Sequence, residues 1–140
     1  MTKTILITGA SSGLGKATAK YLVKKKYKVF GTSRNPKNYS NNNSFELLPF
    51  NLNKPQTSKD LVDQVLDKSG RIDVLINNAG LGITGAIEET DLIAMESNFK
   101  TNFFGPLALI QQILPIMRSQ KSGLIINCLL YTSDAADDRV

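Results

Sequence analysis

The glycine-rich segment between the first apolar run and the first amphipathic stretch limits most strongly what this chain can fold into. Residues 3–8 form a short Ile-rich run typical of a buried strand, and residues 13–26 place apolar side chains at helical spacing. Gly9, Gly13 and Gly15 lie at the junction. A strand that turns into a helix through glycines predicts a β–loop–α unit whose helix N-terminus can face an anion.

The three glycines have different expected roles. Gly9 turns the chain, Gly13 lets the backbone approach a phosphate without a Cβ in the way, and Gly15 lets helix and strand pack closely. A P-loop is excluded, because Ala10 stands where the first glycine of that motif belongs and Ala17 where its Ser or Thr belongs. A tight turn that binds no ligand remains the alternative.

The rest of the chain alternates apolar runs with amphipathic stretches, a pattern typical of a parallel sheet with helices on both faces. The predicted class is α/β, with a Rossmann-like doubly wound sheet of which the chain holds the first five strands. In the first helix, Leu14, Ala17, Thr18, Tyr21 and Leu22 recur at the spacing of an apolar face. The expected strands are 3–8, 28–33, 45–50, 73–77 and 123–127, and the expected helices are 13–26, 58–68 and 92–120, the last kinked or broken by Pro106 and Pro115.

Composition excludes several kinds of function. The chain has 140 residues, one Cys and no His, which excludes a disulfide framework and His-dependent nucleophilic catalysis and leads us to expect no metal. No apolar run approaches the ~18–20 residues of a membrane span, and no secretory signal is evident, so we expect a cytoplasmic protein without a membrane partner. The net charge is +5, but Lys24-Lys25-Lys26 lacks interleaved aromatic residues or a reader motif, so we expect no nucleic-acid partner.

Three motifs together resemble the short-chain dehydrogenase/reductase family. They are Thr8-Gly-x3-Gly-x-Gly after the first strand, Asn77-Asn78-Ala79-Gly80 after the fourth, and Asn102-x-x-Gly105 in the long helix. The resemblance covers residues 2–127 and is closest to the hydroxysteroid-dehydrogenase-like branch, on residues 31–36, 70–80 and 101–105. It implies an oxidoreductase that moves a hydride between a nicotinamide cofactor and a small-molecule carbonyl or alcohol, with a homodimeric or homotetrameric parent protein.

The resemblance also implies where the cofactor binds. The end of the second strand meets the adenosine ribose, where an acidic residue would bind the 2′-hydroxyl of NAD. This chain has Ser33-Arg34 instead, which suits a 2′-phosphate, so we expect NADP rather than NAD, with a solvated Arg34 as the alternative. Asn51, where the family usually has Asp, would meet the adenine. The expected cofactor-binding residues are Gly9, Ser11, Ser12, Gly13, Leu14, Gly15, Ser33, Arg34, Asn51, Leu52, Asn78, Ala79 and Gly80.

Asn102 is the expected catalytic residue. Asn is unfavourable in a helix interior, and the resemblance implies that this one bends the helix and holds a water of a proton relay. The segment 77–80 is implied to bring backbone beside the cofactor ribose and to brace the sheet. The alternatives are an exposed helix residue for Asn102 and an Asn-rich turn for 77–80.

The family's catalytic Ser and its Tyr-x3-Lys pair have no counterpart in the printed chain. The expected Ser position holds Leu130, Tyr131 is followed four positions later by Ala135, and no Lys follows Lys121. We therefore expect the chain to be inactive as printed. Two alternatives stay open: a non-catalytic NADP-binding sensor of the same fold, and a chain that is not stable because its fifth strand lacks a neighbour.

The composition shifts near the end of the chain. Residues 128–137 resemble a translated transposase-end sequencing adapter, whereas the preceding chain favours Lys, Asn and Ile. We interpret residues 1–127 as an incomplete NAD(P)-binding domain and residues 128–140 as a non-native tail. A natural divergent tail is the alternative, and codons that differ from the adapter would establish it.

Overall fold

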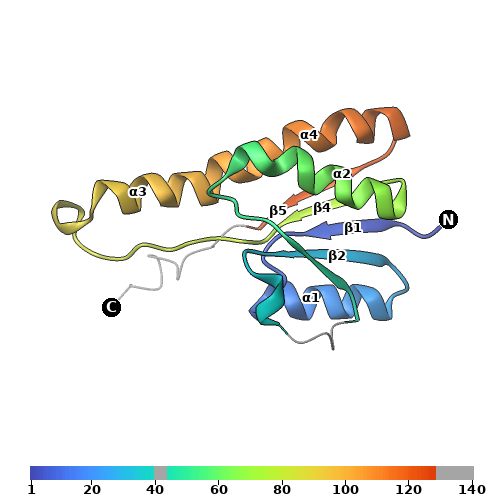
Figure 1. Cartoon of the computed structure of the whole chain (residues 1–140), viewed down its shortest axis with the longest axis horizontal. Helices are drawn as coiled ribbons and strands as arrows, with labels where there is room; N and C mark the ends of the chain where they lie inside the picture. Colours follow the sequence, from blue (N-terminus) through green and yellow to red (C-terminus); the bar gives the residue numbers. More distant parts are fainter. Residues whose placement is uncertain (40–43, 129–140) are drawn as a thin grey trace, which may run out of the picture.

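The computed structural model describes residues 1–39 and 44–128. Five parallel strands form one sheet in the order β3-β2-β1-β4-β5, with helices on both faces (Figure 1). Because the chain starts at the centre of the sheet and winds outward in both directions, the predicted doubly wound α/β class is confirmed. The strands are β1 (Thr4–Ile7), β2 (Lys28–Ser33), β3 (Glu46–Pro49), β4 (Val74–Asn77) and β5 (Leu124–Asn127). The helices are α1 (Gly13–Lys24), α2 (Ser58–Ser69), α3 (Leu92–Phe99) and α4 (Gly105–Gln120), with 3₁₀ turns at Pro36–Asn38, Pro55–Thr57 and Ile87–Glu89 and a π-helical turn at Lys100–Phe104.

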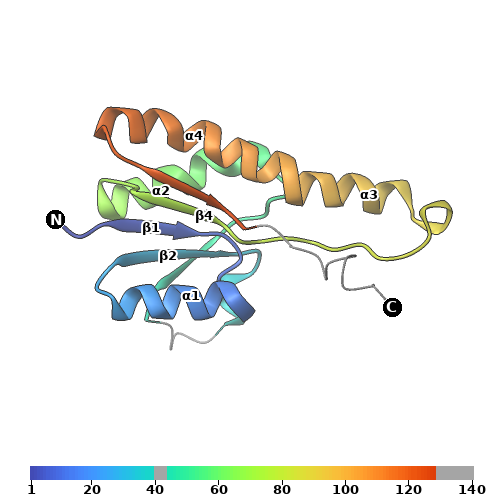
Figure 2. The same cartoon turned by 180° about the vertical axis from the view of Figure 1, so that it is seen from behind.

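Two apolar clusters hold the layers together, because successive side chains of a strand point to opposite faces of the sheet. Leu6 of β1 belongs to the cluster shared with α2 and α4, which includes Leu61 and Leu109. Ile5 and Ile7 belong to the other cluster, which includes Ala19 of α1. Both views accordingly show α1 on one face of the sheet and α2 and α4 on the other (Figures 1 and 2).

The prediction of which α1 residues form its apolar face is wrong, although the helix forms where expected. Its buried residues are Gly15 and Ala19, whereas Leu14 and Tyr21 are 81% and 58% exposed. The prediction followed the larger side chains, but small side chains allow a helix to lie close to a sheet. Ala17 and Thr18 are also exposed, and Leu22 alone of the five predicted residues is partly buried.

The long helical segment is interrupted by the π-helical turn. Pro106 lies in the first turn of α4, directly after the π-helical turn whose last hydrogen bond runs from the Gly105 amide to the Lys100 carbonyl. Because proline has no N–H, the helical hydrogen-bond pattern is interrupted at this point although the helix continues. Pro115 lies inside α4 and does not end it. The interruption at residues 100–104 contains Asn102, and π-helical turns of this kind often occur at functional sites.

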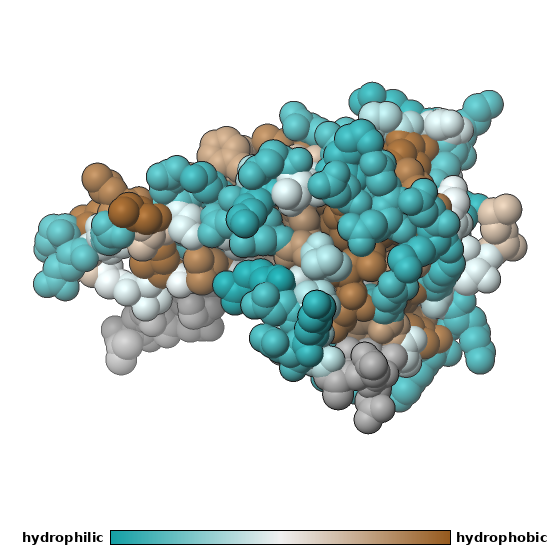
Figure 3. Space-filling view, in the orientation of Figure 1, coloured by the Kyte–Doolittle hydropathy of each residue, from teal (hydrophilic) through white to brown (hydrophobic). Residues whose placement is uncertain are grey.

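Groups of exposed apolar side chains lie around α3 and at the β5 edge of the sheet. Around α3, at one end of the molecule, Ile87, Leu92 and Ile93 are each about three-quarters exposed, at 76%, 77% and 76% (Figure 3). At the sheet edge, Leu124 of β5 is 53% exposed, and among the described residues β5 pairs with β4 alone. Such an edge can accept a further strand, as the sequence predicts.

Asp73 links three strands at the amino-terminal edge of the sheet. Its carboxylate is 4% exposed and accepts hydrogen bonds from the Thr4 amide at 2.7 Å and from the Arg71 guanidinium. Its backbone bonds to Thr4 of β1 and Leu124 of β5, each at 2.9 Å. The hydrogen bond from Arg71 is the main reason that the pKa of Asp73 lies below its usual value, and the Thr4 amide lowers this pKa further.

Asp73→Asn should therefore lower the free energy of unfolding by about 1–3 kcal/mol at neutral pH, the cost of losing charge-assisted hydrogen bonds to a buried group. Because the pKa is lowered in the folded state, this stabilisation is present above the unfolded-state pKa of ~3.9 and is lost as the pH falls below it. Urea unfolding of both proteins over a pH series should show their stability difference shrinking on acidification. A difference that does not change with pH would contradict this assignment.

Candidate functional site

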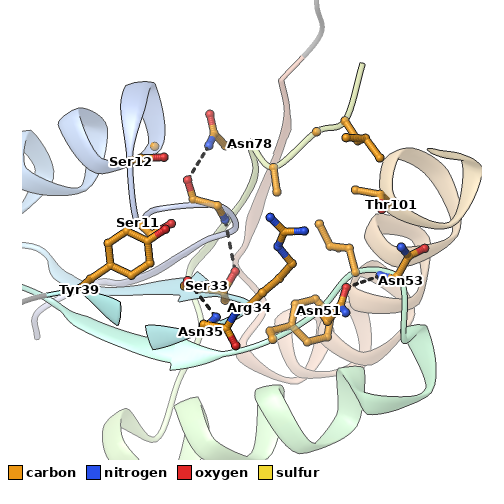
Figure 4. A pocket seen from close by; sticks show the side chains of 18 of the residues that line it. Ser11, Ser12, Ser33, Arg34, Asn35, Tyr39, Asn51, Asn53, Asn78 and Thr101 are labelled. Carbon is orange, nitrogen blue, oxygen red and sulfur yellow. Dashed lines mark hydrogen bonds between the residues drawn. The ribbon is translucent and has the colours of Figure 1, made fainter. Parts of the chain in front are cut away.

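A cavity of about 510 Å³ opens at the carboxyl ends of β1, β2 and β4 (Figure 4). Ligands of doubly wound sheets bind at this edge, where the strand order reverses. The cavity brings together residues from five separate segments of the chain. The predicted residues that line it are Gly9, Ser11, Ser12, Leu14, Gly15, Ser33, Arg34, Asn51, Leu52, Asn78, Ala79 and Gly80, whereas Gly13 and Asn102 do not line it.

Close approach of the backbone explains two of the glycines. Gly9 has φ +67°, and a Cβ there would lie 2.9 Å from the Cα of Ala79. A Cβ on Gly15 would clash with the carbonyl oxygen of Gly9 and lie 2.5 Å from the side-chain nitrogen of Asn78. Gly15 thus permits contact with the turn and with Asn78, rather than only the helix–strand packing predicted from the sequence.

Hydrogen bonds of Thr8 connect the glycine-rich turn to the segment after β4. This residue is fully buried, and its hydroxyl oxygen accepts hydrogen bonds from the amides of Asn78 and Ala79, both at 3.0 Å. In return, the Asn78 side chain donates to the carbonyl oxygens of Thr8 and Gly9 at 3.1 and 3.2 Å. Two motifs that lie far apart in the sequence therefore form one rigid wall of the cavity.

The amino terminus of α1 is available to an anion. Its N-cap residue, Ser12, has an extended backbone and makes no side-chain capping bond, and the first turn of α1 contains no acidic residue. The first N–H groups of a helix have no helical partner. Gly13 has φ +53°, and a Cβ there would meet no atom within 4 Å. The backbone at Gly13 is open, but Gly13 does not line the cavity, and its contact with a phosphate stays a prediction.

Arg34 supplies the positive charge of the cavity. It extends from the end of β2 into the space that Figure 4 shows between the turn and the segment after β3. Ser33 beside it is buried, and its hydroxyl oxygen accepts the Asn35 amide at 3.3 Å. Among the described residues that line the cavity, Arg34 is the one charged side chain. This donor set fits a polyanionic ligand.

The wall opposite the turn is built from the segment after β3. The Asn51 side-chain oxygen accepts the Asn53 amide at 3.0 Å, a local turn that fixes the Asn51 carboxamide. The Asn53 side chain donates to the Ser97 hydroxyl of α3 at 2.6 Å. Leu52 is buried against Gly105, where a Cβ would lie 2.7 Å from the Leu52 carbonyl oxygen.

Asn102 lies beside a second, more apolar cavity of about 720 Å³. Its side-chain oxygen accepts the Leu81 amide at 2.8 Å, and its side-chain nitrogen donates to the Leu81 carbonyl at 2.7 Å and to Asn98 at 3.1 Å. Asn102 is exposed, as in the alternative of an exposed helix residue, but both polar atoms of its side chain form hydrogen bonds. It holds the segment after Gly80 against the π-helical turn, and its proposed part in a proton relay stays a prediction.

Sequence reasoning missed several residues of the site. Thr8 opens the first motif, and Thr32, Asn35 and Thr101 lie within segments 31–36 and 101–105, but none of them was singled out for the site. The other missed residues carry no motif and come together only through folding. The missed residues are Thr8, which holds the wall, and the lining residues Thr32, Asn35, Asn38, Tyr39, Phe50, Asn53, Leu81, Ser97 and Thr101.

The described residues offer neither a candidate metal site nor a membrane-spanning helix. In residues 1–39 and 44–128, no group of three or more His, Cys, Asp or Glu side chains could hold a metal ion. Nor does any helix of those residues combine the length and apolarity needed to cross a bilayer. The positions Leu130 and Tyr131 and almost all of the interpreted tail lie outside the described residues.

Sequence comparisons relate the chain to proteins of known class. The family described as short chain dehydrogenase matches residues 3–137. The chain is 42% identical to the 3-ketodihydrosphingosine reductase of Bacteroides thetaiotaomicron over 123 residues, 88% of this chain and 45% of that protein. It is 38% identical to human retinol dehydrogenase 8 over 133 residues, 89% of this chain and 43% of that protein. The chain thus spans about half the length of the curated relatives it matches.

Comparison with solved structures also relates the chain to short-chain dehydrogenases and oxidoreductases. A short-chain dehydrogenase from Streptomyces avermitilis matches with a TM-score of 0.82 at 34% identity, covering 90% of this chain and 48% of that one. A metagenomic short-chain oxidoreductase in complex with NADP matches with a TM-score of 0.82 at 28% identity, covering 89% and 61% of the two chains.

Proposed function

The chain belongs to the short-chain dehydrogenase family, and we propose on this basis that it is the NADP-binding part of an oxidoreductase that interconverts a ketone or aldehyde and an alcohol. Residues 1–127 would form the incomplete cofactor domain and residues 128–140 a non-native tail. Because the family match runs on to residue 137, the codons of residues 128–140 decide between this tail and a natural one. The parent protein would be a homodimer or homotetramer, as the family resemblance implies, and cytoplasmic, as expected from the sequence.

The observation that carries the NADP proposal is Arg34. An acidic residue at the end of β2 would accept the 2′-hydroxyl of NAD and repel a 2′-phosphate. Here a guanidinium extends into the cavity from that strand end, beside the Ser33 hydroxyl. A guanidinium presents several N–H donors to phosphate oxygens, so it favours the phosphorylated cofactor.

The other residues of the cavity would take the remaining parts of NADP. The amides at the start of α1 and the hydroxyls of Ser11 and Ser12 would hold the pyrophosphate, and Asn51 would bind the adenine. When bound, NADP supplies or accepts the hydride. The structural relative in complex with NADP supports this cofactor, and the names of the ketodihydrosphingosine reductase and the retinol dehydrogenase describe carbonyl–alcohol chemistry.

Arg34→Asp should reverse the cofactor preference. We expect calorimetric titration of the 140-residue chain to show NADP⁺ binding more tightly than NAD⁺. The variant should lose about 10- to 100-fold in NADP⁺ affinity, because a charge-assisted hydrogen bond is replaced by repulsion, and should keep or gain NAD⁺ affinity.

Lys37→Asp is the matched control for this prediction. It makes the same change of charge three positions away, at an exposed residue that does not line the cavity. It should leave the NADP⁺/NAD⁺ ratio within a few-fold of the wild-type value. An Arg34 variant that keeps its preference for NADP⁺, or a control that loses it equally, would remove the basis of the proposal.

A second candidate is a non-catalytic NADP-binding sensor of the same fold. The nucleotide sequence of the whole gene separates the two candidates. A reading frame that continues past Asn127 into a Ser and a Tyr-x3-Lys pair means an enzyme, and one that continues without them means a sensor.

A further inference from the structure

The basic residues of the chain are strongly segregated. Residues 1–45 contain nine Lys or Arg residues and no Asp or Glu, whereas residues 46–140 contain eight basic and twelve acidic residues. The excess positive charge therefore belongs to the part of the fold formed by β1, α1 and β2. The acidic residues lie elsewhere in the sequence.

Five of these basic residues gather at one end of the molecule, which we call the lysine end. It comprises the exposed residues Lys3, Lys24, Lys25, Lys26 and Lys28. The amide of Lys28 donates to the carbonyl of Lys3 at 3.0 Å, so the N-terminal segment lies against the α1–β2 turn. Figures 1 and 2 both show this turn beside the N-terminus, at the edge of the sheet away from the carboxyl ends of the strands. The lysine end is therefore separate from the proposed NADP site.

None of the five lysines forms an ion pair within the described residues, although Lys3 is close enough to Asp73 to help lower the pKa of that carboxyl. The four ion pairs of residues 1–39 and 44–128 all join residues from position 46 onward. Lys28 donates to the carbonyl of Lys68, which leaves its charge in place. Lys25 lies 5.5 Å from the ring centre of Tyr21, and that ring is 58% exposed. The surface thus combines positive charge with exposed aromatic rings.

Lys26 adopts an unfavourable backbone conformation at this surface. It follows α1 with φ +68°, the left-handed conformation in which helices usually end on glycine. A lysine in this conformation is less favourable than glycine because of its Cβ. The position therefore keeps a charge where the backbone alone would prefer glycine.

We propose that the lysine end docks on an anionic phospholipid surface. All five basic residues are lysines, whose compact charges suit a diffuse negative surface, whereas recognition of individual phosphates in nucleic acid favours the guanidinium fork of arginine. Neither cavity described above includes any of these lysines, so the surface suits a flat partner better than a small ligand. Tyr21 and Tyr27, both exposed, are of the residue type enriched at lipid–water interfaces. This peripheral contact differs from the expectation of no membrane partner, which rested on the lack of a spanning segment.

Vesicle sedimentation of the 140-residue chain tests the proposal. The chain should bind vesicles of equal parts phosphatidylcholine and phosphatidylserine, should not bind vesicles of phosphatidylcholine alone, and should dissociate as salt is added. Each lysine near an anionic surface should strengthen binding about fivefold. The triple variant K24Q/K25Q/K26Q should therefore bind about a hundredfold more weakly. The triple variant K54Q/K59Q/K100Q removes the same charge from positions outside the lysine end and should bind within a few-fold of wild type.

Lys26→Gly removes one charge of the lysine end without destabilising the fold. Glycine suits φ +68°, so this variant should melt at the same or a higher temperature and still bind the anionic vesicles about fivefold more weakly. Equal losses in the two triple variants would mean that net charge alone acts, and this would overturn the proposal. So would equal binding to both kinds of vesicle, no binding to either, or tighter lysine-dependent binding to a DNA duplex than to the anionic vesicles.

Discussion

Gly15→Ala should lower the free energy of unfolding by about 3 kcal/mol, because a single methyl group is forced into a space that backbone already fills. A Cβ at this position would clash with the Gly9 carbonyl oxygen, and the Asn78 side chain would lie 2.5 Å away. Neither group can move without disturbing the wall of the cavity. Urea or thermal unfolding measures the stability change, and calorimetry should show that NADP⁺ binding is lost together with the geometry of the turn.

Gly82→Ala is the matched control. A Cβ at Gly82 would meet no atom within 4 Å, and its φ lies outside the left-handed range. The same substitution should therefore change stability by no more than about 0.5 kcal/mol, as is usual for exposed positions. If Gly15→Ala proves as mild as Gly82→Ala, the close contact between the turn and Asn78 is not present in solution.

Thr8→Val is expected to have the second large effect. Valine keeps the shape of threonine but removes the oxygen that accepts the amides of Asn78 and Ala79. Thr8 is fully buried, so water cannot replace that oxygen. The Ala79 amide would lose its partner, whereas the Asn78 amide would keep its hydrogen bond to the Ile76 carbonyl at 3.1 Å. The loss should cost about 1–3 kcal/mol, and the segment after β4 should become more mobile. Chemical denaturation measures the cost, and hydrogen exchange of the Asn78 and Ala79 amides measures the mobility.

Thr8→Ser separates the hydroxyl from the packing of the side chain. Serine keeps the accepting oxygen and loses only a methyl group, which should cost about 1 kcal/mol. Amide exchange at Asn78 and Ala79 should stay close to wild type in this variant and accelerate in Thr8→Val. Equal acceleration in both variants would assign the effect to the methyl group and contradict the role given to the hydroxyl.

The fold could be predicted well from the sequence because its elements have clear local signals. The strands contain continuous apolar runs, and Leu61, Val62 and Val65 are buried in α2 at the spacing of one helix face. The face of α1 could not be predicted in this way, because Gly15 and Ala19 are buried for their small size rather than their hydrophobicity. The π-helical turn also lacks a simple sequence signal.

The candidate site was predictable where a motif has a local structural reason. The turn from 8 to 15 and the segment 77–80 combine special backbone geometry with polar side chains, and both lie where the sequence predicts. The contacts between distant segments were not predictable, since Asn53 meets Ser97 only after the sheet and α3 have formed. Asn102 was singled out for its poor helix propensity, but its bonds to Leu81 required the structure.

The central claim is that this chain binds NADP with Arg34 and the first turn of α1. The most direct measurement is an NADP⁺ titration of the isotope-labelled 140-residue chain followed by NMR. The largest shifts should occur at the amides of Gly13, Leu14 and Gly15 and at the Arg34 side chain, and NAD⁺ should leave the Arg34 signal almost unchanged. Shifts that are absent, or that occur outside this cavity, would contradict the claim.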